Sequence, residues 1–154
     1  YMAGERSPIW NPYAKGVFYG LDFTKTRAHF YRAAMEGVAY SLRHNLEIAA
    51  QTGAPVTQLH AMGGAANSKL WTQIKSDVTG LPIRSAKSDM ATTLGAAMLA
   101  GVATGVYKDY AQAVQQTVNM ERSYVPNEEN SSVYERGFCD YLKLYSQLET
   151  LMHG

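Results

Sequence analysis

Apolar side chains recur along the chain with two different spacings, and each spacing predicts a type of element. Three- and four-residue steps predict one long helix that begins after Thr24 or Thr26 and ends at Gly53. Shorter helices are predicted over residues 67–78, 91–104 and 109–118. A final amphipathic helix begins near Ser131, and its apolar side consists of Tyr134, Phe138, Tyr141, Leu142, Tyr145 and Leu148.

Short apolar runs between these helices predict strands over residues 17–21, 57–62 and 81–85. The last of them contains Pro82, which lacks an amide hydrogen and is therefore typical of an edge strand. Residues 120–130, with Pro126, are predicted to form a loop. Because strands alternate with helices, the fold class is α/β with a layered sheet, in one domain over residues 1–154.

Composition and charge reduce the number of function classes that fit this sequence. Of the 154 residues, 46% are hydrophobic and 18% are charged, which is typical of a globular domain. The net charge of +1 gives no strong field for nucleic acid or an anionic membrane. A single cysteine, Cys139, excludes an internal disulfide and favours the cytoplasm. The first residues do not look like a translation start, so we expect a piece of a longer protein.

The segment with the strongest chemical signal is Met62-Gly63-Gly64-Ala65-Ala66-Asn67-Ser68. It follows a predicted strand and precedes a predicted helix, where glycines allow close approach of a ligand and the helix start favours phosphate. The pattern matches neither a Walker motif nor a dinucleotide fingerprint. From the pattern alone, a purely structural turn with a capped helix remains an equal alternative.

Structural roles are favoured for the other polar segments. Residues 4–12 predict an ordered loop, in which an ion pair of Glu5 with Arg6 or another group is favoured over catalysis. The small residues of Leu94-Gly95-Ala96-Ala97 favour close helix packing. The four histidines are scattered, so we predict no metal site. Asp77 stands at a helix end where the dipole disfavours an acid, which predicts a specific partner for its carboxylate.

Taken together, these segments resemble the C-terminal domain of the FGGY family of carbohydrate kinases. The resemblance covers nearly the whole chain and rests on residues 4–21, on Arg32-Ala33-x-x-Glu36-Gly37-x-Ala39, on Gly63-Gly64-Ala65-x-x-Ser68-x-x-Trp71-x-Gln73-x-x-x-Asp77-x-x-Gly80 and on Leu94-Gly95-Ala96-Ala97. Within the family, the first run is most similar to xylulokinases and then to gluconokinases. The resemblance implies a hexokinase/actin-like, ribonuclease H-like fold with a mixed sheet flanked by helices.

The resemblance also favours a nucleotide site at the glycine turn. It implies that the residues in contact with the nucleotide are Gly63, Gly64, Ala65 and Ser68. The chain departs from the family pattern at Ala65, where many members have a third glycine, and at Met90, where several have a glutamate. Lys15 replaces the usual arginine, which keeps the charge but loses the bidentate geometry.

The implied reaction is transfer of the γ-phosphoryl group of ATP to a sugar hydroxyl, with Mg²⁺. The resemblance places the catalytic base, the magnesium ligands and most sugar contacts in an N-terminal domain that is absent from this chain. No residue of the chain is therefore a candidate catalytic or metal-binding residue, and we expect the isolated chain to be inactive.

The sequence leaves alternatives open for both the substrate and the role of the chain. Xylulose is favoured as substrate, and gluconate or another sugar or polyol is the alternative. A non-catalytic actin-like module that binds a nucleotide or a partner chain is a third possibility, because fold alone does not fix function. The uncovered face of such a piece also makes a homodimer possible.

Overall fold

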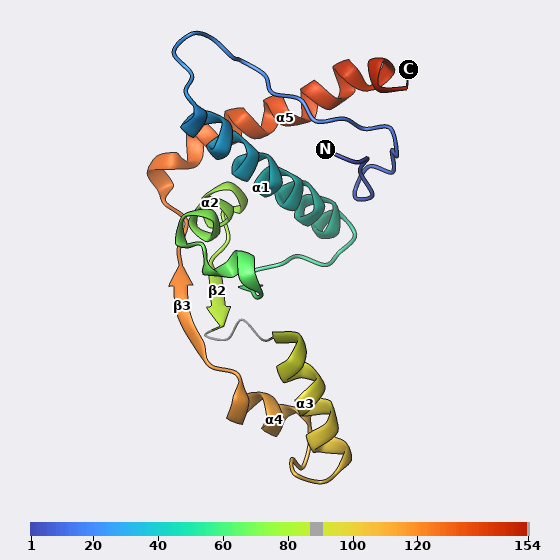
Figure 1. The fold of residues 1–154 in the computed structure, drawn as a ribbon, viewed down its shortest axis with the longest axis vertical. Helices are drawn as coiled ribbons and strands as arrows, with labels where there is room; N and C mark the ends of the chain where they lie inside the picture. The colour runs from blue at the N-terminus through green and yellow to red at the C-terminus, as the bar shows by residue number, and fades with distance from the viewer. Residues whose placement is uncertain (87–90, 154) are drawn as a thin grey trace.

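The computed structural model describes residues 1–86 and 91–153. The elements in chain order are α1 (Arg27–Gln51), β1 (Leu59–Ala61), the 3₁₀ turn η1 (Gly64–Asn67), α2 (Lys69–Thr79), β2 (Ile83–Ala86), α3 (Ala91–Ala103), α4 (Tyr110–Thr117), β3 (Met120–Tyr124), the 3₁₀ turn η2 (Glu128–Asn130) and α5 (Ser131–Met152) (Figure 1). All five predicted helices are confirmed. Among the helices of the described residues, none is long and apolar enough to cross a membrane.

Within the described residues, the sheet has three strands in the order β1-β2-β3. β1 pairs in parallel with β2, so that Leu59 lies opposite Ile83, and β3 pairs with β2 in the antiparallel direction. The predicted edge position of the second strand is therefore wrong, because β2 is central. Pro82 lies just before the ladder, where its carbonyl accepts a hydrogen bond from the Leu59 amide at 3.0 Å and its missing N–H is not needed.

Two further predictions about strands are wrong. Residues 17–21 form no strand, since they find no partner strand among the described residues and the Phe18 ring packs on Phe30 of α1 instead, with the ring centroids 5.2 Å apart. Part of the predicted loop over residues 120–130 is strand β3, which pairs with β2 from Ile83 opposite Tyr124. Because β3 contains charged residues, it lacks the apolar pattern from which a strand is predicted.

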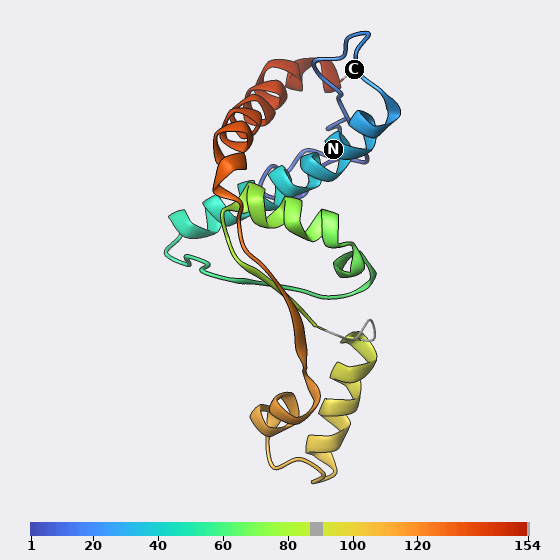
Figure 2. The same cartoon turned by 90° about the vertical axis from the view of Figure 1, so that its left-hand side faces the viewer.

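The elements form two lobes that β2 and β3 connect (Figures 1 and 2). Helices α1, α2 and α5 pack together at one end of the strands, and the α3–α4 hairpin stands at the other end. The core of the larger lobe contains Ala39 of α1, Ile74 and Val78 of α2, and Tyr134 of α5, each at most 4% exposed. The first aromatic residue of the predicted apolar side of α5 therefore lies in the core.

A polar cluster extends this core between α1 and α5. The Arg32 guanidinium donates a hydrogen bond to Glu36 at 2.7 Å and another to the Tyr134 hydroxyl at 2.7 Å. The Tyr134 hydroxyl in turn donates to the Glu36 carboxylate at 3.2 Å. This triangle joins two helices about 100 residues apart in the chain and fixes their relative positions.

We predict that replacing Thr72 with valine stabilises the domain. The Thr72 side chain on α2 is fully buried, and its hydroxyl finds no hydrogen-bond partner. A buried hydroxyl without a partner costs about 1–3 kcal/mol, while valine fills the same space without a polar atom. Urea denaturation should show a higher midpoint for Thr72→Val with an unchanged slope. Thr79→Val is the control, because the Thr79 hydroxyl donates to the Lys75 carbonyl at 2.7 Å, and this variant should gain no stability.

Candidate functional site

The glycine turn joins β1 to α2 and is the candidate nucleotide site. Gly63 has φ +80° and ψ −179°, a backbone conformation that only glycine adopts without strain. The chain then makes the 3₁₀ turn η1, in which Ala66 is buried and anchors the turn. Gly64 and Ala65 are exposed on its outer side. No atom lies within 4 Å of the position that a side chain on Gly63 or Gly64 would take, so a ligand can approach the backbone closely.

The first turn of α2 is held in place by Ser68 and Trp71. The Ser68 hydroxyl accepts a hydrogen bond from the Trp71 amide at 3.3 Å and so caps the helix. The Trp71 indole donates to the Met35 carbonyl of α1 at 3.3 Å, and the Lys75 ammonium lies 4.1 Å from the Trp71 ring centroid. Partial burial lowers the pKa of Lys75. The turn is therefore presented by a helix that is fixed on α1.

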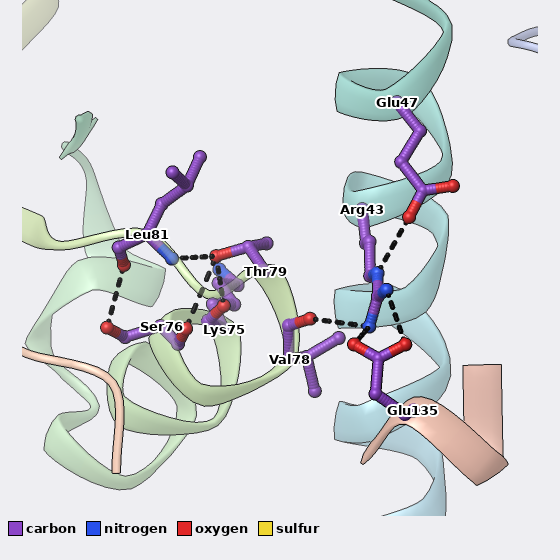
Figure 3. A network of polar contacts seen from close by, with 8 residues as sticks. All are labelled: Arg43, Glu47, Lys75, Ser76, Val78, Thr79, Leu81 and Glu135. Atoms are coloured by element: carbon purple, nitrogen blue, oxygen red, sulfur yellow. Dashed lines mark hydrogen bonds and ion pairs between the residues drawn. The ribbon is translucent and has the colours of Figure 1, made fainter. Parts of the chain in front are cut away.

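The other end of α2 is fixed by Arg43 of α1 (Figure 3). The guanidinium makes two parallel contacts with Glu135 of α5, at 2.7 and 2.9 Å, and one with Glu47 at 2.9 Å. It also donates to the carbonyl of Val78, close to the C-terminus of α2, and lies over the Phe138 ring. The hydrogen bond from Arg43 lowers the pKa of the Glu135 carboxyl. One cation thus links three helices.

Asp77 has the specific partners that its position predicts. Its buried carboxylate accepts hydrogen bonds from the Gln73 side chain at 2.7 Å, from the Asn127 amide at 2.9 Å and from the Asn130 side chain at 3.0 Å. Asn127 and Asn130 belong to the segment between β3 and α5. Asp77 therefore attaches this connection to α2 and does not face the glycine turn, which lies at the opposite end of the helix.

A small open hollow of about 370 Å³ lies next to the start of α2. Its walls come from Lys69, the residue after Ser68, and from Arg122, Ser123 and Tyr124 of β3. Two cationic side chains near a helix N-terminus favour an anion. The sequence did not indicate this pair, because residue 122 was predicted to lie in a loop and strand pairing alone brings it beside Lys69.

The N-terminal segment is an ordered loop, as predicted. Glu5 and Asn11 exchange backbone hydrogen bonds at 2.9 Å, and the Asn11 side chain donates to the Tyr145 hydroxyl of α5 at 2.8 Å. The Glu5 carboxylate accepts hydrogen bonds from the backbone amides of Arg6 and Ser7 at 2.9 and 3.2 Å. Glu5 therefore has the structural role that was predicted. Its carboxylate fulfils this role by binding backbone amides, and not by forming the expected ion pair.

The four predicted nucleotide-contact residues lie together on one turn, and three of them are exposed: Gly64, Ala65 and Ser68. Met90, where the chain departs from the family pattern, lies outside the described residues. Within residues 1–86 and 91–153, no three histidine, cysteine or acidic side chains gather in a way that could hold a metal ion. The candidate site is therefore made of backbone, small side chains and nearby cations.

Comparison with known proteins gives the family. The sequence model described as "FGGY family of carbohydrate kinases, C-terminal domain" matches residues 1–104. A xylulose kinase of Staphylococcus epidermidis is 32% identical over 98% of this chain and 30% of its own length, and a gluconokinase of Bacillus subtilis is 34% identical over 97% and 29%. The crystal structure of a xyloylose kinase from Brucella ovis superposes with a TM-score of 0.88 over 98% of this chain and 31% of that one, at 28% identity.

The chain belongs to the FGGY family of carbohydrate kinases and corresponds to its C-terminal domain. Its fold is that of the solved kinases of this family, hexokinase/actin-like with a mixed sheet. The chain spans about 30% of the length of the curated relatives that it matches.

Proposed function

We propose that the chain is the nucleotide-binding part of an ATP-dependent sugar kinase, and that Gly63, Gly64, Ala65 and Ser68 contact the nucleotide. The observation that carries this proposal is the open turn at the start of α2, in which Gly63 has a conformation that only glycine adopts without strain, in a chain whose family consists of phosphoryl-transfer enzymes. Because Gly63 and Gly64 have no side chains, a phosphate or an adenosine can approach the backbone amides of the turn closely.

The residues of the chain fit binding and orientation of the nucleotide. Backbone dipoles of the turn and the charges of Lys69 and Arg122 would stabilise the negative charge of ATP during transfer. The anchoring of α2 by Trp71 and Arg43 would keep these donors in position without reorganisation. Mg²⁺ would reach the site with the phosphates of ATP, where it neutralises charge, and we place its protein ligands outside this chain.

We further propose that the base and the sugar site lie in an N-terminal domain of a longer polypeptide. A base must lie within hydrogen-bond reach of the sugar hydroxyl. The C-terminal domain alone would then bind nucleotide without turnover. The single cysteine of the chain suits the cytoplasm as the compartment of the reaction.

The proposed substrate is xylulose, with xylulose 5-phosphate as product. The loop over residues 4–21 and the xylulose kinase of S. epidermidis among the relatives support this choice. Gluconate is the alternative, since the gluconokinase of B. subtilis is equally similar. A coupled ADP-release assay on the complete polypeptide with xylulose, gluconate, glycerol and ribulose should give the highest kcat/KM for xylulose. A tenfold preference for gluconate would overturn the assignment of xylulose as substrate. The absence of turnover with all four compounds would contradict the proposed kinase activity.

A further inference from the structure

His44 of α1 lies against α5 in an aromatic contact, and one of its ring nitrogens is buried without a hydrogen-bond partner. The imidazole meets the rings of Phe138 and Tyr141 edge to face, with the ring centroids 6.3 Å apart in each pair. Phe138 is buried and stacks on Tyr141, with the centroids 6.1 Å apart. No described atom forms a hydrogen bond with the buried Nδ1 of His44. The packing of the ring therefore leaves this nitrogen without a polar contact.

This environment fits a neutral imidazole and not a protonated one. A neutral histidine carries one ring proton, whereas both ring nitrogens are donors in the charged form. Protonation in the folded chain would therefore place a charged N–H group at the buried Nδ1 position, where it has no acceptor among the described residues. In the unfolded chain, water can bind both nitrogens. The fold thus favours the neutral ring, because a buried charge without a partner is costly.

The carboxylates that act on His44 do not supply the missing acceptor. Glu47 on α1 binds the Arg43 guanidinium at 2.9 Å. The Glu5 carboxylate accepts hydrogen bonds from two backbone amides of its own loop. Burial lowers the pKa of His44, and the negative charges of Glu47 and Glu5 oppose this shift without cancelling it.

The groups around the α5 side of the contact do not favour a second cation either. The Arg43 guanidinium already lies over the Phe138 ring, 4.3 Å from its centroid. Its partner on α5 is Glu135, at 2.7 Å (Figure 3). Burial raises the pKa of Tyr141, so its hydroxyl carries no charge that could stabilise an imidazolium. A protonated His44 would therefore share the Phe138 ring with a cation whose carboxylate partners are already bound.

We propose that His44 makes the contact between α1 and α5 sensitive to pH, so that protonation of its imidazole loosens the packing of Phe138 and Tyr141 on α1. The effect extends to α2, because Arg43 lies on the same Phe138 ring and donates to the carbonyl of Val78 near the end of that helix. The lobe is then tightly packed at neutral pH and loosened in acid. This property is independent of the proposed kinase reaction.

The pH range of the switch follows from the direction of the pKa shift. A histidine whose folded-state pKa lies below its ordinary value of about 6.5 contributes its full stabilisation above that value. The contribution of His44 is lost as the pH falls through the lower pKa of the folded chain. The neutral ring should therefore stabilise the lobe at about pH 7.5 and fail to do so at about pH 5.

Two variants at position 44 and one control test this proposal. In the full 154-residue chain, the thermal midpoint of the wild type should fall between these two pH values by about 3 °C more than that of His44→Phe or His44→Gln. Neither replacement titrates, so each removes the proton-dependent part of the stability. His60→Phe is the control, because His60 is exposed on β1 and its loss should leave the wild-type response unchanged. Equal falls in the wild type and in both variants at position 44 would overturn the proposal.

Hydrogen exchange in the wild type gives a test that does not require a folded variant. After correction for intrinsic rates, amides of residues 138–145 should lose about tenfold or more of their protection between the two pH values. The α3–α4 hairpin over residues 91–117 contains no histidine and serves as the internal reference. Unchanged protection at residues 138–145, or an equal loss in the hairpin, would contradict a role for His44. These readouts need neither nucleotide nor substrate, so their failure would leave the proposed kinase function intact.

Discussion

Replacing Gly63 with alanine is expected to destabilise the domain by about 1–3 kcal/mol and to abolish nucleotide binding at the turn. Gly63 adopts φ +80° with ψ near 180°, a region that is essentially restricted to glycine. Space is not the obstacle, because no atom lies within 4 Å of the position of the added carbon. The cost therefore comes from the backbone alone, and relieving it would reorient the amides that begin η1.

Gly64→Ala is the matched control. Gly64 is the next residue, has the same free space around the position of an added side-chain carbon, and does not have a positive φ. Alanine there should leave stability unchanged or raise it by up to about 1 kcal/mol, because it restricts the unfolded chain. Urea denaturation of both variants measures the difference. Equal losses of stability would mean that the conformation of Gly63 is not required, and the account of the turn would be wrong.

Replacing Asp77 with alanine is expected to cost about 2–4 kcal/mol of stability, without a direct effect on the nucleotide contacts. The change removes the acceptor for the Asn127 amide and the Asn130 side chain, which attach the connection between β3 and α5 to α2. These donors are partly shielded from water in the fold, so the loss of their acceptor is only partly compensated by hydration. Asp77→Asn should recover less than half of the loss, because its amide group would direct a donor at other donors.

Asp140→Asn on the exposed side of α5 is the control, with an expected change within about 0.5 kcal/mol. Chemical denaturation gives the stability of each variant, and an amide-shift titration with Mg-ADP gives the affinity. A variant at position 77 that keeps wild-type stability would show that the three hydrogen bonds contribute little. A stable variant that fails to bind nucleotide would assign Asp77 to the site itself.

The helices could be predicted from the sequence because their signals are local. Thr26, Ser68 and Asp109 begin helices as N-caps, and Gly80 ends α2 in a left-handed conformation. The strands were harder to predict because strand formation depends on a partner elsewhere in the chain. β3 carries charged residues and is a strand because β2 lies beside it, and the apolar run over residues 17–21 lacks such a partner.

In the candidate site, too, the features that depend on local sequence could be predicted, and those that depend on distant parts of the chain could not. The glycine turn follows directly from its residues, and its identity as a nucleotide site follows from the family motif around it. Lys69 and Arg122 come together only through the pairing of β3 with β2, so no spacing in the sequence indicated them. Asp77 could be recognised as unusual from its place at a helix end, but Asn127 and Asn130, two of its three partners, lie about 50 residues away in the chain.

Nucleotide binding at the turn is tested most directly by amide chemical shifts of the labelled 154-residue chain during titration with Mg-ADP and Mg-ATP. The account predicts saturable shifts at Gly63, Gly64, Ala65 and Ser68 and at neighbouring Lys69, with Gly63→Ala removing them. Shifts confined to another surface, or none at millimolar nucleotide both here and in the complete polypeptide, would contradict it.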